Sequence, residues 1–282
     1  MRRHIRPSAR GFTLTELAIV TTIIGLLLAS LLYTLSAQVE QRNFEDTRRR
    51  LEQARDLVIA FAIANGRLPC PARFASAASN SQGLESFCAA ATGACAGTET
   101  TTVQSHGNCS NYYDGYLPAA SIGFQTTDSS GFAMDAWSNR IRYAVTKTPP
   151  ACAPANTLVY TSSANLKTYG VACQPPDLLI CKSSSGPITG ASCISAANQV
   201  TTNNLVTSVI FSTGKNFLTA QTAAAATAAG RTDEAANLDG DASFVFHTPS
   251  PSGAANGEFD DQFVWITSGE LYGRLVAAGM LP

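Results

Sequence analysis

Eight cysteines carry the clearest covalent chemistry of this chain. They are Cys70, Cys88, Cys95, Cys109, Cys152, Cys173, Cys181 and Cys193. An even number of cysteines in Ser-, Thr- and Gly-rich surroundings predicts disulfides, and hence an oxidising compartment. Free thiols and a metal site are the alternatives, but no Cys-x-x-Cys pair occurs to favour zinc. The sequence does not say which cysteines pair, because eight allow many connectivities.

Other reactive side chains do not form a known catalytic pattern. His4, His106 and His247 are scattered along the chain. Ser212-Thr213-Gly214-Lys215-Asn216 is similar to part of a phosphate-binding loop, but it lacks the first glycine and the hydroxyl residue after Lys215. A turn between strands explains this segment better. We therefore expect no enzymatic activity and no organic cofactor.

Composition and charge exclude further classes of protein. Charged residues make up 14% of the 282 residues and the formal net charge is −1. That charge is too small for binding nucleic acid by bulk electrostatics, so no nucleic-acid partner is expected. Four of the basic residues precede Gly11 and form a separate basic segment: Arg2, Arg3, Arg6 and Arg10.

An apolar segment follows this basic segment. Residues 17–39 carry no charge, and about 20 apolar residues suffice to span a bilayer. Basic residues stay on the cytoplasmic side of a membrane, so residues beyond the segment would lie outside the cytoplasm. A cleaved secretory signal and a plain anchor are two interpretations, but a plain anchor leaves the carboxylate of Glu16 unexplained.

A third interpretation accounts for Glu16. Gly11-Phe12-Thr13-Leu14-Thr15-Glu16-Leu17 resembles the prepilin-type signal of type IV pilins and type II secretion pseudopilins. The resemblance implies cleavage after Gly11 by a prepilin peptidase and methylation of the new amine of Phe12. It further implies that Glu16 pairs with the terminal amine of a neighbouring subunit and sets the register of assembly. A buried carboxylate and a buried ammonium lower each other's desolvation cost.

One long helix is expected to begin in this signal. The spacing of Phe44, Leu51, Ala54, Val58 and Phe61 continues a helical face beyond the apolar segment. The opposite face mixes both signs of charge and is either solvated or an interface between subunits. Asn65-Gly66 and Pro69 predict the end of the helix. We therefore expect a leader at 1–11, a helix at 12–64 with a transmembrane part at about 14–37, and a periplasmic head at 65–282.

The head is expected to be α+β, with an antiparallel sheet packed on the long helix. Strands are predicted at 140–145, 157–161, 205–212, 243–247 and 262–267, and a helix at 270–278 capped by Ser268. Residues 74–110 and 149–199 have the composition of surface loops. A disulfide at Cys70 would anchor the exit from the long helix. The segment Asp135-Ala136-Trp137-Ser138-Asn139 resembles a hairpin of pseudopilin heads.

Calcium is the one ligand that the resemblance suggests, since major pseudopilins bind it near the end of the head. The candidate oxygens belong to four aspartates: Asp128, Asp135, Asp239 and Asp241. The alternative is that they bond their own backbone in turns. Asp260-Asp261 is interpreted as the edge of a loop, or as a recognition patch together with Trp265.

The expected function is that of a structural subunit in the inner membrane, with a single membrane pass and its head in the periplasm. Its partners would be other pilin or pseudopilin subunits, prepilin peptidase and the inner-membrane assembly platform. After assembly it would reside in a type IV pilus or a secretion pseudopilus. No proline lies between Pro7 and Pro69, whereas main-fibre pilins often have one there, which favours a minor or tip subunit. The alternative is a membrane-anchored periplasmic binding or adhesion protein that does not polymerise.

Overall fold

A computed structural model describes residues 11, 13–74, 80–95, 97–147, 151–184, 193 and 195–281, without the side chains of 30–36. Phe12 and the first ten residues of the expected leader lie outside this range. The chain divides into two compact units, Met1–Glu45 and Asp46–Pro282. The two are described separately below.

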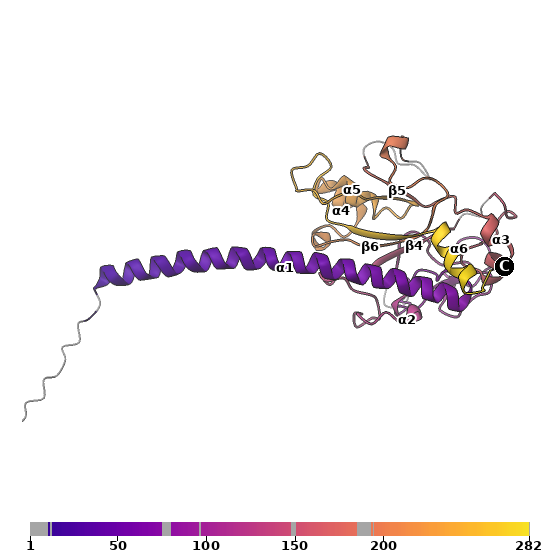
Figure 1. Cartoon of the computed structure of the whole chain (residues 1–282), viewed down its shortest axis with the longest axis horizontal. Helices are drawn as coiled ribbons and strands as arrows, with labels where there is room; N and C mark the ends of the chain where they lie inside the picture. The colour runs from indigo at the N-terminus through magenta and orange to yellow at the C-terminus, as the bar shows by residue number, and fades with distance from the viewer. Residues whose placement is uncertain are drawn as a thin grey trace, which may run out of the picture. The chain divides into compact units, whose positions relative to one another are not determined.

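One long helix, α1, spans Leu14–Asn65 (Figure 1). Its end follows from local chemistry: Gly66 adopts φ +66° and its N–H bonds the carbonyl of Ala62 at 2.8 Å. Glycine takes this left-handed conformation without steric cost, so it closes the helix. Within the described residues, no helix is both long and apolar enough to qualify as a membrane span.

In the second unit, α1 packs on the core of the head. Leu51, Ala54, Val58 and Ala62 are at most 1% exposed, and their three- and four-residue spacing places them on one helical face. They share a cluster with Tyr143 and Ile210 of the central sheet and with Leu271 and Leu275 near the C-terminus.

The central sheet has four antiparallel strands in the order β3-β4-β6-β8. Its strands are β3 (Gly115–Tyr116), β4 (Arg142–Val145), β6 (Val206–Ser212) and β8 (Gln262–Thr267). Tyr143 pairs with Ile210, and Ile210 pairs with Val264. Both faces are covered, so β6 is buried at every residue: α1 lies on one side, and β5, α4 and α5 on the other (Figure 1).

The second face carries its own apolar cluster. Val209 and Phe211 of β6 contact Phe244, Val245 and Phe259 there. The covering elements are β5 (Leu179–Cys181), β7 (Ser243–Val245), α4 (Ala223–Ala228) and α5 (Thr232–Ala236). The β5 and β7 strands pair in parallel. This differs from the all-antiparallel head that we expected, and it is possible because a long segment, which includes β6, connects the two strands.

Short elements complete the head. They are β1 (Phe87–Cys88), β2 (Glu99–Thr100), α2 (Ala119–Ile122), α3 (Ser163–Tyr169), η2 (Gly170–Ala172), η3 (Ala196–Asn198), η4 (Phe217–Thr219) and α6 (Ser268–Ala277). The mixed helix and sheet class is thus confirmed, whereas the bounds of several elements differ from those expected.

Three local predictions were wrong. Residues 157–161 form a turn rather than a strand, since Tyr160 and Val159 enter the core and the Tyr160 carbonyl accepts a bond from the N–H of Leu68 at 2.8 Å. Thr267, not Ser268, caps α6, and its hydroxyl accepts the Glu270 N–H at 3.2 Å. Parts of 74–110 and of 149–199 are core rather than surface, because Glu85–Cys88 and Leu178–Cys181 are at most 3% exposed.

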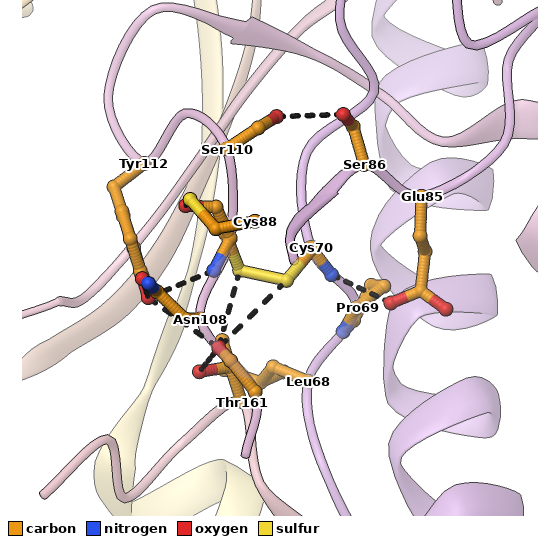
Figure 2. The surroundings of a disulfide bond; sticks show 12 residues. Leu68, Pro69, Cys70, Glu85, Ser86, Cys88, Asn108, Ser110, Tyr112 and Thr161 are labelled. Carbon is orange, nitrogen blue, oxygen red and sulfur yellow. Dashed lines mark hydrogen bonds between the residues drawn. A yellow bond between two sulfur atoms is a disulfide. The ribbon is translucent and has the colours of Figure 1, made fainter. Parts of the chain in front are cut away.

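The predicted disulfides are confirmed, and all eight cysteines are paired. The bonds join Cys70–Cys109, Cys88–Cys95, Cys152–Cys173 and Cys181–Cys193. Figure 2 shows the first of these beside the exit from α1. There the Cys70 N–H donates to Glu85 at 2.7 Å, and the Cys109 N–H donates to the Tyr112 hydroxyl at 3.0 Å.

Candidate functional site

The start of α1 forms a capping box. The backbone N–H and the hydroxyl of Thr13 both donate to a Glu16 carboxylate oxygen, at 2.9 and 2.8 Å. The Glu16 N–H donates back to the Thr13 hydroxyl at 3.3 Å. The reciprocal bonds satisfy donors that a helix start otherwise leaves open. Glu16 therefore has a structural task within its own chain, which the sequence analysis missed although the Thr-x-x-Glu spacing signals it.

The first turns of α1 expose a large apolar surface. Nine large aliphatic side chains among residues 14–28 are between 46% and 85% exposed: Leu14, Leu17, Ile19, Val20, Ile23, Ile24, Leu26, Leu27 and Leu28. Contiguous exposed apolar surface on this scale marks a site of contact with a partner or a membrane.

The four aspartates expected for calcium lie in turns. Asp128 accepts the N–H groups of Ser130 and Phe132, each at 2.9 Å, and pairs with Arg140 at 2.8 Å. Asp135 accepts two N–H groups of its own turn and the Ser212 hydroxyl at 2.6 Å. These contacts use most of the acceptor capacity of both carboxylates.

Asp239 and Asp241 have the same character. Asp239 accepts the Asp241 N–H at 3.1 Å, and Asp241 accepts the Ser243 N–H at 2.7 Å. In the described part of the chain, none of the four aspartates belongs to a group of three or more residues that could share an ion. Calcium binding by these four residues stays a prediction.

The structure instead gathers Glu234, Asp260 and Asp261, whose carboxylate oxygens lie within 4.8 Å of one another. We call these three residues the acidic group. Glu234 comes from α5, while Asp260 and Asp261 precede β8. Because Ser212 at the end of β6 pairs with Gln262 at the start of β8, the turn after β6 also lies at this end of the sheet.

That turn contacts the acidic group directly. The Lys215 N–H donates to Asp260 at 3.2 Å, and the Asn216 side chain donates to Glu234 at 2.8 Å. The turn approaches so closely that a Cβ on Gly214 would lie 1.7 Å from the Asp260 Oδ1 atom. Only glycine fits there, which gives a physical role to the glycine of the phosphate-loop-like segment.

The acidic group holds more negative charge than its partners neutralise. Arg231 pairs with Glu234 at 3.0 Å, and both side chains are at most 6% exposed. In the part of the chain that the structure describes, Asp260 and Asp261, each 3% exposed, have no comparable buried cation at hydrogen-bond distance. Among the described residues, the Asp261 carboxylate accepts one hydrogen bond, from the Asn237 side-chain amide at 2.7 Å.

Buried oxygens without a partner concentrate at the acidic group. Eight buried polar side-chain atoms in the described ranges lack a hydrogen bond, and four of them are oxygens here: Thr213 Oγ1, Asn216 Oδ1, Asp260 Oδ1 and Asp261 Oδ1. Unpaired buried polar atoms are costly and call for an explanation. An oxygen-rich set of this kind is the donor set that hard divalent cations prefer.

Burial changes the pKa values of the three carboxyl groups in the acidic group. Burial, reinforced by the charges of Glu234 and Glu258, raises the pKa of Asp260 to about 7. Burial also raises the pKa of Asp261 well above its usual range, and it raises the pKa of Glu234. Without a bound cation the group therefore retains protons near neutral pH. Because Asp260 and Asp261 are each 3% exposed, their interpretation as a recognition patch was wrong.

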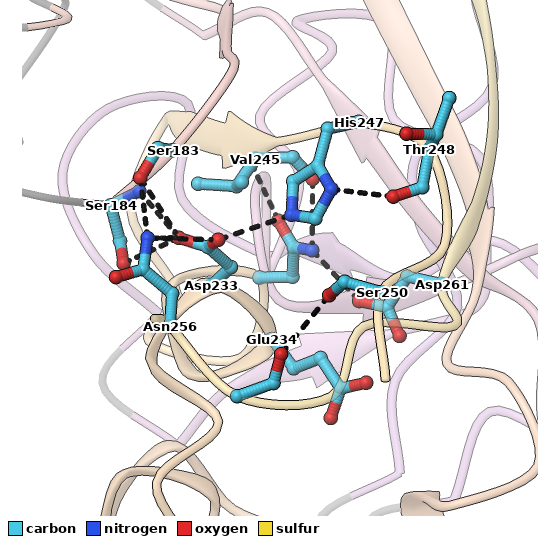
Figure 3. Close-up of polar contacts among 12 residues, drawn as sticks. Ser183, Ser184, Asp233, Glu234, Val245, His247, Thr248, Ser250, Asn256 and Asp261 are labelled. Atoms are coloured by element: carbon cyan, nitrogen blue, oxygen red, sulfur yellow. Dashed lines mark hydrogen bonds and ion pairs between the residues drawn. The ribbon is translucent and has the colours of Figure 1, made fainter. Parts of the chain in front are cut away.

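A second polar cluster resembles a catalytic set but has another geometry (Figure 3). His247 Nε2 lies 3.1 Å from Asp233 Oδ2. The Ser184 hydroxyl bonds the other Asp233 oxygen at 2.7 Å, and Ser183 and Asn256 also donate to this carboxylate. The serines thus contact the acid and not the histidine, whereas nucleophilic catalysis needs a serine on the histidine. The cluster fastens Ser183 and Ser184 to α5.

Comparison with known proteins identifies one motif, at the N-terminus of the chain. Residues 6–32 match the family described as the prokaryotic N-terminal methylation motif. This motif is the signature of the prepilin-type signals of type IV pilins and pseudopilins, which are membrane-associated proteins assembled at the surface. The chain is therefore similar to a substrate of prepilin peptidase, as its sequence predicted. No curated protein and no solved structure matches the chain.

Proposed function

We propose that this chain is a structural subunit that prepilin peptidase cleaves after Gly11 and methylates on Phe12. It then assembles with other pilin or pseudopilin subunits at an inner-membrane platform. The methylation motif at residues 6–32 carries the proposal. The exposed aliphatic side chains of residues 14–28 support it, since packed neighbouring helices or lipid would cover them.

In this proposal the segment at about 14–37 lies in the inner membrane before assembly, and the head lies in the periplasm. The uncharged sequence of residues 17–39 and the basic residues before Gly11 support that orientation. The four disulfides support an oxidising compartment for the head.

The test of processing is the intact mass of the protein from membranes with and without prepilin peptidase. We expect the loss of residues 1–11 and the gain of one methyl group only when the peptidase is present. The same mass in both strains would contradict the proposal. A Phe12→Ala variant should be cleaved with the same mass difference from its own precursor, which checks that the methyl group does not lie on the Phe12 side chain.

We further propose a minor or tip position in the fibre, on the basis of the missing proline and the large loop-rich head. Deleting the gene separates the two machines. Loss of surface filaments with normal secretion assigns the subunit to a type IV pilus, and the reverse assigns it to a type II secretion pseudopilus. Normal filaments and normal secretion favour the alternative, an anchored binding or adhesion protein that does not polymerise.

We also propose that the acidic group binds calcium. Three carboxylates and Arg231 leave a formal charge of −2 when all are ionised, which one divalent cation neutralises. The unpartnered oxygens of Asp260, Asp261 and Asn216 would supply ligands. Calcium accepts irregular sets of six to eight oxygens, whereas magnesium requires a regular octahedron. The role proposed for the ion is to fix the ends of β6 and β8 in the head.

A further inference from the structure

Two adjoining hollows in the head share Arg73. The first has a volume of about 410 Å³ and is lined by Phe74, Asn111, Asp114, Tyr116 and Arg142. The second has a volume of about 380 Å³ and is lined by Asn80, Ser81, Ser86, Glu99 and Thr100. Each falls in the size range of small-molecule sites. We call the two together the Arg73 groove.

The charges of the Arg73 groove balance in pairs. Arg73 forms an ion pair with Glu99, and Arg142 forms one with Asp114. The groove therefore has no net charge and offers no excess of cations to a phosphate or another strongly anionic ligand. Its remaining polar side chains carry hydroxyl and amide groups, which favours an uncharged ligand rich in hydrogen-bonding groups.

The polar groups of the groove are held in place by their own contacts. Two hydrogen bonds join Asp114 and Asn111. The Asp114 N–H donates to the Asn111 side-chain oxygen at 3.1 Å, and the Asn111 side-chain amide donates to the Asp114 backbone carbonyl at 2.5 Å. The hydroxyls of Ser86 and Ser110 bond each other at 2.7 Å. Groups that are already positioned lose little entropy when a ligand binds.

Within the described residues, each arginine of the two ion pairs bonds one oxygen of its carboxylate. Arg142 bonds Asp114 through Oδ1, and Arg73 bonds Glu99 through Oε1. The Asp114 side chain is 50% exposed and can accept a further donor from a ligand. A planar carboxylate beside a guanidinium offers acceptors and donors side by side, which suits two neighbouring hydroxyl groups of one ring.

Aromatic rings border the first hollow. Phe74 is 38% exposed, and its ring centroid lies 4.4 Å from the Arg140 guanidinium, which lies at the same distance from Phe132. The Arg142 guanidinium lies 4.8 Å from the Tyr116 ring. The cations thus hold the rings in place while Phe74 remains accessible. The C–H face of a pyranose packs on such a ring because both surfaces are weakly polar.

We propose that the Arg73 groove binds an uncharged oligosaccharide. One sugar ring packs on Phe74, and its hydroxyls bond Asp114 and Asn111. The next ring lies past Arg73 toward Glu99 and Ser86. The disulfides support a location outside the cytoplasm, where such glycans occur.

The test uses the full-length protein in a detergent without a sugar headgroup, because maltosides and glucosides would compete for the groove. Labelled protein is applied to a glycan array that holds neutral, sialylated and sulfated oligosaccharides. We expect retention by a subset of the neutral glycans. Retention by none of the glycans, or by the anionic ones alone, would overturn the proposal.

Variants assign the binding to the groove. Phe74→Ala and Asp114→Asn should each lower the affinity for the neutral glycan that binds most tightly by at least tenfold. Leu218→Ala and Asp56→Asn are matched controls, since Leu218 is 66% exposed and Asp56 lies on an exposed position of α1, both outside the lining of the groove. Asp114→Asn keeps the side-chain shape and so remains informative if Phe74→Ala does not fold. Unchanged affinity in a folded Asp114→Asn variant and in a folded Phe74→Ala variant would place the sugar elsewhere and refute the proposal.

Discussion

Arg67 and Glu85 form a doubly hydrogen-bonded ion pair, with N–O distances of 2.6 and 2.9 Å, just beyond the end of α1. Both side chains are at most 6% exposed, and Glu85 also accepts the N–H of Cys70. The pair thus links the helix exit to the Cys70–Cys109 disulfide, and Figure 2 shows the bond between Glu85 and Cys70.

Removing one partner of this pair should destabilise the head strongly. Arg67→Ala leaves the buried Glu85 carboxylate without its cation, which typically costs about 3–5 kcal/mol. Urea unfolding of the full-length protein in detergent measures the change in unfolding free energy. Arg55→Ala is the matched control, because its partner Glu270 is 24% exposed and the expected cost is smaller. Equal losses in both variants would mean that burial does not set the strength of the Arg67 pair.

Glu16 substitutions separate its two roles. Glu16→Gln keeps an acceptor for the capping box but removes the charge, whereas Glu16→Ala removes both. If the charge pairs with a neighbouring amine, both variants lose incorporation into fibres. Only Glu16→Ala should lower helix protection at Leu14–Glu16, measured by amide hydrogen exchange. Normal incorporation of Glu16→Gln together with loss of incorporation in Glu16→Ala would show that assembly requires the cap and not the charge.

The contribution of each disulfide to the free energy of unfolding should increase with the length of the loop that it closes. Cys70 and Cys109 are separated by 39 positions in the sequence, and Cys88 and Cys95 by 7. Replacing both cysteines of a bond by alanine opens the loop that the bond closes. Chain-entropy estimates give losses of about 4 and about 2.5 kcal/mol. Urea unfolding of the two double variants tests the order. A larger loss for the short loop would point to native contacts rather than chain entropy as the source.

Calcium should raise the melting temperature of the protein, because an ion bound only to the folded state stabilises it. Asp261→Asn should abolish the increase, since it removes one charge from the acidic group. Asp241→Asn tests the turn aspartates and should leave the increase intact. If Asp241→Asn abolishes it and Asp261→Asn does not, the ion binds at the turn and our proposed site is wrong.

Without calcium, the acidic group should make stability fall as pH rises from about 4 to about 7. In this range an unfolded aspartate is ionised, whereas Asp260, with a pKa raised to about 7, still holds its proton in the folded state. The folded state then binds more protons, so raising the pH favours unfolding, by up to about 1.4 kcal/mol per unit for one group. Denaturant titrations over this pH range measure the slope.

Two comparisons assign that slope to the acidic group. Asp260→Asn cannot ionise and should have a flatter profile than the parent protein. Saturating calcium should also flatten the profile, because the ion stabilises the ionised carboxylates in the folded state. A parent-like slope in Asp260→Asn would show that other groups control the pH dependence.

The sequence by itself determined the features that depend on local chemistry. The segment from Gly11 to Leu17 identified the methylation motif, and Asn65-Gly66 predicted the end of α1 because only a left-handed residue closes a helix in that way. The predicted bounds of β8 are confirmed, since a short run of aromatic and β-branched residues favours a strand. The Thr-x-x-Glu spacing of the capping box was equally readable, although it was overlooked.

Only the tertiary structure decided the features that join distant segments. Pairing of the cysteines, the parallel contact of β5 with β7, and the acidic group of Glu234 with Asp260 and Asp261 all depend on how the chain crosses the sheet. The register of β6 against β8 places Gly214 next to Asp260, 46 residues further along the chain. No local pattern encodes such proximity, because it is set by which apolar faces the whole chain can bury together.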